Sequence, residues 1–207
     1  NYPPEAFLSM MNFLGTHDTP RILTVLGADN VPDSKADRAA YRLSPTQRQI
    51  GLERLRLAAL ILFTFPGAPT VYYGDEAGVC GWTDPDSRRT YPWGHEDLEL
   101  IEFHRYMIRI HKALPVLRSG AVKELLAGRN VIAYGRMLGK YQAVVAVNNN
   151  AQERELELPV WQLGITGEIS LARLMLTTEE GYNVGGLRYP VQNGILKLKL
   201  PAYSAAL

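Results

Sequence analysis

The 207-residue sequence has a single cysteine, Cys80, and no long run of apolar residues. One thiol excludes an internal disulfide and a zinc site built from cysteines. The longest apolar run, Leu57–Phe63, is far shorter than the roughly 20 residues that cross a bilayer. Neither sign of charge dominates, since 22 Lys and Arg stand against 21 Asp and Glu. We therefore expect no membrane or nucleic-acid partner, and the free thiol favours a cytoplasmic location.

An initiator methionine is also missing, because the sequence begins Asn-Tyr-Pro-Pro. Together with the lack of a signal peptide, this start indicates a piece of a longer protein. Apolar residues make up 46% and charged residues 21%, which is typical of globular domains and excludes a disordered tail or a fibrous rod. The length allows one large domain or two small ones at about 100–200 residues each.

The first 119 residues have the pattern of helices alternating with short buried strands. Ser44 and Gln47 form a capping-box signature, and the apolar stripe that follows continues to Pro66. A strand is predicted over 70–73, an earlier one over 12–15, and a final helix over 98–114. A helix followed by a short buried strand is typical of a parallel α/β sheet.

After Gly120 the apolar period changes from that of a helix to that of a strand. Short strands are predicted over 131–134, 143–147, 156–158 and 195–200, with turn residues between them. Strands at this spacing indicate a small antiparallel sandwich. We therefore divide the chain into an α/β part over residues 1–119 and an all-β domain over residues 120–207.

Two groups of polar residues directly follow the predicted strands of the α/β part. The first contains Thr16, His17 and Asp18, at a position where parallel α/β folds place active-site residues. A His-Asp pair that caps the next helix is an equally good interpretation of this local sequence. The second contains Asp75 and Glu76, for which we favour a structural role such as pairing with an arginine, because adjacent turn residues point apart.

A third group is the loop over residues 81–93, which is dense in carboxylate, guanidinium and aromatic side chains. This combination binds sugars, because aromatic faces pack on pyranose rings while Asp and Arg hold hydroxyl groups. Taken alone, the loop fits slightly better with a surface segment held by its own salt bridges.

Together, these groups resemble the α-amylase family of glycoside hydrolases. The resemblance rests on Thr16-His17-Asp18, on Tyr73-Gly74-Asp75-Glu76 and on the loop Asp84-Pro85-Asp86-Ser87-Arg88-Arg89 with Tyr91-Pro92-Trp93. The loop is most similar to the neopullulanase and cyclomaltodextrinase branch. The ending Leu200–Leu207 is also similar to the close of that family's C-terminal β-domain.

This resemblance implies the C-terminal part of a (β/α)₈ barrel, strands seven and eight with their helices, followed by an antiparallel β-sandwich. It implies retaining hydrolysis of α-1,4-glucan oligosaccharides derived from starch, or of cyclodextrins. By motif, Asp18 resembles the carboxylate that stabilises the transition state, and His17 the histidine that donates to the same sugar. Asp84 and Arg88 match substrate-binding positions, whereas Tyr73–Glu76 resembles a motif that supports the last strand.

Nothing in the sequence matches the family's nucleophile or its acid/base, so we expect the chain alone to be inactive. The alternative is a non-catalytic glucan-binding or scaffold relative.

No cofactor or metal is expected, and calcium is conceivable only in an intact enzyme. The acidic residues Asp29, Asp33 and Asp37 fit a solvated charge run better than a calcium loop. We expect His104 and His111 to lie on a solvated helix face. Two barrel strands without their neighbouring strands have unpaired edges, so we expect two copies of the chain to associate as a dimer.

Overall fold

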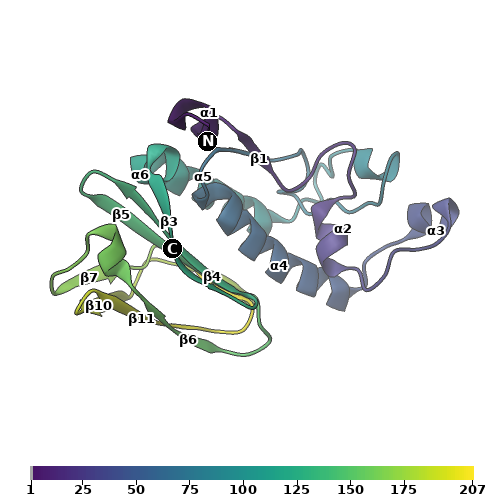
Figure 1. Ribbon diagram of the computed structural model, residues 1–207. Coiled ribbons are helices and arrows are strands. Elements are labelled where there is room, and N and C mark those ends of the chain that lie inside the picture. The colour runs from purple at the N-terminus through teal and green to yellow at the C-terminus, as the bar shows by residue number, and fades with distance from the viewer. Residues whose placement is uncertain (1) are drawn as a thin grey trace. The chain divides into compact units, whose positions relative to one another are not determined.

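The computed structural model describes residues 2–207, and its backbone contacts divide them into two compact units (Figure 1). The helical unit comprises Ser9–Phe63 and Gly67–Ile110. The sheet unit comprises the residues up to Leu8, Thr64–Pro66 and His111–Leu207. The sheet unit thus takes in short segments that lie before residue 120, and the domain division at residue 120 stays a prediction. No helix among residues 2–207 is long and apolar enough to cross a membrane.

Helices and two short strands make up the elements before residue 120. They are α1 (Pro4–Leu8), β1 (Met11–Phe13), α2 (Ile22–Gly27), α3 (Lys35–Ala40), α4 (Pro45–Thr64), β2 (Ala68–Thr70), the 3₁₀-helix η1 (Asp86–Arg88), α5 (Leu98–Ala113) and α6 (Pro115–Ser119).

Helix α4 begins as its sequence predicts. The Gln47 amide donates to the Ser44 Oγ at 3.2 Å, and the Ser44 amide donates to the Gln47 Oε1 at 3.0 Å, which completes a capping box. Beyond the cap the helix is buried on several sides, with Leu55 and Leu60 almost fully enclosed. Helix α4 is therefore a core element of the helical unit.

Strands β1 and β2 pair in parallel, as the alternating pattern predicts. Met11 lies opposite Ala68, and Phe13 lies opposite Thr70. The second strand comes earlier than the predicted span of 70–73, because Gly67, at a φ of 126°, turns the chain directly after α4. The following residues, Val71–Tyr73, leave the pair and lead into a turn.

Helix α5 matches its predicted span to within one residue, but the prediction for His104 was wrong. The His104 side chain is buried against the rings of Phe63 and Phe103. Its Nδ1 lies 2.8 Å from the Leu100 carbonyl, and burial lowers its pKa. His104 is thus a core residue of the helical unit.

The sheet unit is an antiparallel sandwich. Within the described residues, one sheet has the strand order β3-β4-β5-β12-β8-β9 and the other the order β6-β11-β10-β7. The strands are β3 (Ala121–Gly128), β4 (Val131–Leu138), β5 (Tyr141–Asn148), β6 (Arg154–Leu158), β7 (Ile169–Ala172), β8 (Met175–Thr178), β9 (Gly181–Val184), β10 (Arg188–Gln192), β11 (Ile195–Leu200) and β12 (Ser204–Ala206), with the 3₁₀-helix η2 (Val160–Leu163) between β6 and β7.

Apolar side chains from both sheets share one core, in which Leu158, Val160 and Leu200 are fully enclosed. A buried arginine, Arg136, lies at its border, where the guanidinium donates to the carbonyls of Thr64 and Gly120. The alternation predicted over 195–200 is strand β11, whose Leu196, Leu198 and Leu200 face this core. The sandwich therefore forms as its sequence predicts, with more strands than the alternation alone reveals.

Candidate active site

The polar groups that follow β1 and β2 lie in the helical unit, beyond the carboxyl ends of two parallel strands. At such an edge, strands bring residues that are distant in sequence close together. His17 and Asp18 follow β1, and the loop with Asp84 and Arg88 follows β2. All four predicted site residues come together in one cluster.

Arg88 joins the cluster. Its Nη2 lies 3.4 Å from the Asp18 Oδ1, and its Nε lies 2.9 Å from the Asp84 Oδ1. The other carboxylate oxygen of Asp18 lies 3.0 Å from the His17 Nε2. These side chains keep 48% to 72% of their surface exposed. A guanidinium and an imidazole therefore orient two carboxylates that a solvent-borne molecule can reach.

The backbone around Asp18 is fixed by a tight turn. The Asp18 amide donates to the Thr16 Oγ1 at 3.2 Å, and the Thr16 amide donates to the Thr19 Oγ1 at 3.0 Å. The second loop also holds this turn, since the Ser87 Oγ donates to the His17 carbonyl at 3.3 Å. Hydroxyl groups from two segments thus position the His-Asp pair. These bonds engage only backbone atoms of His17 and Asp18, and the imidazole and the carboxylate are 60% and 72% exposed.

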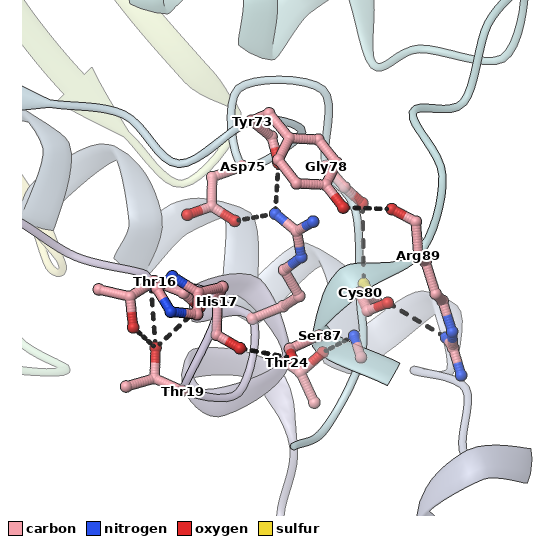
Figure 2. A network of polar contacts seen from close by, with 12 residues as sticks. Thr16, His17, Thr19, Thr24, Tyr73, Asp75, Gly78, Cys80, Ser87 and Arg89 are labelled. Carbon is pink, nitrogen blue, oxygen red and sulfur yellow. Dashed lines mark hydrogen bonds and ion pairs between the residues drawn. The ribbon is translucent and has the colours of Figure 1, made fainter. Parts of the chain in front are cut away.

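Beneath the cluster lies a buried ion pair. The Arg21 Nη1 lies 3.1 Å from the Asp75 Oδ1 and also donates to the Tyr73 carbonyl; Figure 2 labels Asp75 and Tyr73. The guanidinium packs on the rings of Tyr72 and Tyr73. The side chains of Arg21 and Asp75 are 0% and 6% exposed. Burial raises the pKa of Asp75 to about 6, although the Arg21 guanidinium opposes this shift. Asp75 therefore supports the turn after β2, in agreement with the structural role that we favoured.

The loop over residues 81–93 is held mainly through backbone carbonyls (Figure 2). The Arg89 guanidinium donates to the Cys80 and Ala39 carbonyls at 3.1 and 2.9 Å, and the Arg89 carbonyl accepts from the Tyr73 hydroxyl at 2.9 Å. The Thr24 Oγ1 accepts from the Gly81 amide at 2.9 Å. The loop also has internal salt bridges, as one of our two interpretations held, since the Arg89 Nη2 lies 3.2 Å from the Asp86 Oδ1. Bonds to residues outside the loop add to them, while Asp84 and Arg88 remain exposed at its tip.

Sequence reasoning assigned no role to Arg21, Thr24, Ser87 or Arg89, which support the cluster. For Arg21 the signal was partial, because a carboxylate buried at a strand end, such as Asp75, needs a cation, but Arg21 lies 54 residues from it in the sequence. Thr24 and Ser87 bond to backbone atoms 57 and 70 residues away, which no local pattern reveals. Arg89 bonds to the Ala39 carbonyl 50 residues away, although its ion pair with Asp86 is local. Among residues 2–207, the structure has no group of three or more His, Cys, Asp or Glu side chains placed to hold a metal ion.

Comparison with known proteins places these residues in a family. Residues 5–107 match the model of the α-amylase catalytic domain. The chain is 42% identical over 66% of its length to an amylopullulanase of Thermoanaerobacter thermohydrosulfuricus, and 34% identical over 100% to one of Thermoanaerobacterium thermosulfurigenes. Cyclomaltodextrinases and a neopullulanase are also among its relatives.

A solved structure, the native debranching enzyme of Nostoc punctiforme, covers 99% of the chain with a TM-score of 0.72 at 29% identity. The chain spans 9% and 11% of the two amylopullulanases and 36% of the debranching enzyme. The shared fold therefore extends over both the helical unit and the sheet unit. On this evidence, the chain belongs to the α-amylase family of glycoside hydrolases.

Proposed function

We propose that the chain forms the C-terminal region of a retaining α-glucan hydrolase, with strands β1 and β2 as the seventh and eighth strands of its barrel. The substrates are starch-derived malto-oligosaccharides or cyclodextrins. The observation that carries this proposal is the exposed cluster in which His17 and Arg88 hold Asp18. Family membership and the parallel pairing of β1 with β2 support it.

Asp18 stabilises the transition state in this proposal. Glycoside hydrolysis passes through an oxocarbenium-like state, whose positive charge and distorted ring favour a nearby fixed carboxylate. Since His17 and Arg88 already orient the Asp18 oxygens, little reorganisation is needed when charge develops. His17 donates to hydroxyl groups of the same sugar.

Asp84 and Arg88 bind a neighbouring glucose unit. Their mutual contact at 2.9 Å leaves free donors on the guanidinium and free lone pairs on the carboxylate, which suit the vicinal hydroxyls of a sugar. Both side chains lie on the exposed tip of a loop whose base is fixed. They therefore contribute to affinity in the ground state and in the transition state alike.

The retaining reaction also needs a nucleophile and an acid/base about 5–5.5 Å apart. In the cluster, Arg88 lies between the carboxylates of Asp18 and Asp84. This arrangement fits substrate binding and charge stabilisation better than the roles of nucleophile and acid/base. We therefore propose that the 207 residues alone release no sugar from glucans. Activity then requires further barrel strands, and no cofactor is part of the proposal. In the absence of those strands, the chain forms a dimer.

The proposal is tested in the full-length enzyme that contains these residues, with maltoheptaose as substrate. Asp18→Asn is expected to lower kcat with little change in KM, whereas Asp84→Asn is expected to raise KM. Asp33→Asn, at an exposed acidic residue outside the cluster, serves as the control. Binding of maltoheptaose by a full-length protein without any hydrolysis would instead establish the non-catalytic relative.

A further inference from the structure

The helical unit contains a hollow of about 740 Å³, formed by residues around the start of α4 and by the turn and loop that follow β2. Three arginines line it, namely Arg42, Arg48 and Arg89, and so does His95. No aspartate or glutamate of residues 2–207 lines it. We call it the basic hollow. Its volume lies within the range of about 300–1,000 Å³ that is typical of small-molecule sites.

The basic hollow is distinct from the cluster around Asp18. Its lining includes Cys80 and Arg89 but not Asp18, His17 or Arg88. Figure 2 shows Cys80 and Arg89 together, away from His17. The side chains of the neighbours Arg88 and Arg89 have different partners, since Arg88 contacts Asp18 whereas Arg89 donates to the Cys80 carbonyl. A ligand in the basic hollow therefore meets a separate set of side chains.

Backbone carbonyls fix the three guanidinium groups in place. The Arg48 Nη1 donates to the Gly78 carbonyl at 3.1 Å, and the Arg89 Nη1 donates to the Cys80 carbonyl at 3.1 Å. The Arg42 Nη1 donates to two carbonyls of its own segment, at 3.0 and 2.7 Å. These bonds restrict the side chains without neutralising their charge. Little side-chain freedom is therefore lost when an anion binds.

One of the three arginines has no carboxylate partner among residues 2–207. The Arg48 Nη2 lies 2.8 Å from the Asp97 Oδ2, and the Arg89 Nη2 lies 3.2 Å from the Asp86 Oδ1. Arg42, by contrast, is bonded to carbonyls, and within the described residues its Nε and Nη2 have no protein partner. The planar fork of a guanidinium matches two oxygens of a phosphate group. Arg42 thus has both the charge and the donors that such a group needs.

We propose that the basic hollow binds the phosphate group of a small molecule, with Arg42 as the main contact. Arg48 and Arg89 add attraction, and the Thr90 hydroxyl and the His95 ring, which also line the hollow, supply further donors. A phosphate group fills only part of 740 Å³, so there is room for an attached organic group such as a sugar. The inference goes beyond the proposed function, because glucan hydrolysis requires no phosphate.

The test measures binding to the full-length enzyme by calorimetry, with inorganic phosphate and glucose 6-phosphate as probes. Arg42→Gln is expected to weaken binding at least about tenfold, because charge-assisted hydrogen bonds are lost. Arg42 is exposed, so this change leaves the core intact. Arg38→Gln is the matched control, since Arg38 also donates to carbonyls, those of Pro32 and Asp33, but does not line the hollow. It is expected to leave the affinity unchanged.

The two probes distinguish the sources of the phosphate group. If binding depends on Arg42, a higher affinity for glucose 6-phosphate identifies a sugar phosphate as the ligand, and a higher affinity for inorganic phosphate identifies the free anion. Three results would overturn the inference: no binding of either probe, equal affinity in the native enzyme and Arg42→Gln, and equal losses in Arg42→Gln and Arg38→Gln. The last would show attraction by net charge alone. None of these results bears on the kinetic test of Asp18.

Discussion

The buried pair of Arg21 and Asp75 makes the stability of the helical unit depend on pH. An aspartate next to an arginine usually ionises at a lower pH than a free one, yet burial raises the pKa of Asp75 from 3.8 to about 6. In the unfolded chain the carboxyl group ionises near its ordinary value. The folded state therefore holds the proton more tightly than the unfolded state between about pH 4 and pH 6.

The sign and size of the effect follow from this difference. Where the folded state binds more protons, the free energy of unfolding falls as the pH rises. A shift of about two pKa units at 1.36 kcal/mol each corresponds to about 3 kcal/mol, which is fully present below about pH 4 and lost above about pH 6. Since the Asp75 side chain is 6% exposed, solvent screens little of this energy.

The assay compares urea unfolding of the native sequence and of Asp75→Asn across this pH range. The difference in unfolding free energy, native minus variant, is expected to fall by about 3 kcal/mol as the pH rises from about 4 to 6. Because other titrating groups are common to both proteins, the subtraction isolates Asp75. A difference that rises with pH would refute the reasoning, since it would mean that the Arg21 ion pair outweighs burial. A flat difference would refute it as well.

Two further predictions concern the same unit. A Cβ at Gly15 would lie 2.5 Å from the Asp75 Oδ2, so Gly15→Ala is expected to lower the free energy of unfolding by about 1–3 kcal/mol, measured by urea unfolding. The loss should shrink in an Asp75→Ala background, and equal losses in both backgrounds would contradict the contact. Self-association is checked by sedimentation: Met11 and Phe13 of β1 are 61% and 47% exposed, so we expect a dimer at micromolar concentration, and a clean monomer would contradict this.

Local signals predicted the two long helices, α4 and α5, but not the short helices α1, α2, α3 and α6. The capping box of Ser44 and Gln47 and the apolar stripe that follows it are contained within one segment, and the structure confirms both. The environment of His104 was not predictable in this way. Its ring lies on the buried face of α5 because the aromatic rings of Phe63 and Phe103 enclose it, and its Nδ1 is satisfied by a backbone carbonyl one turn earlier.

Strands depended more on their partners than on their own sequence. Strand β11 alternates Leu with Lys and could be predicted to the residue. Strand β7, by contrast, is mostly exposed, and β10 contains Pro190. Both form because each lies against the other in an antiparallel pair. No periodicity within either segment carries that information.

The candidate site likewise contains residues that the sequence identifies and supporting contacts that only the structure shows. The residue types in the motifs led to Asp18, His17, Asp84 and Arg88, and the structure brings them together although Asp18 and Arg88 are 70 residues apart. The supporting bonds of Ser87 and Thr24 go to backbone atoms of distant loops. Such bonds are set by the tertiary fold, so only the structure reveals how the cluster is held.

The most direct test of this account is the kcat/KM of Asp18→Asn for maltoheptaose in the full-length enzyme. Removal of one group that stabilises transition-state charge typically costs about 10²–10³ in rate, and we predict a loss in that range. The Asp33→Asn control should retain the native value. A value for Asp18→Asn within about tenfold of the native enzyme would contradict the role of Asp18, because it corresponds to less than about 1.4 kcal/mol of transition-state stabilisation.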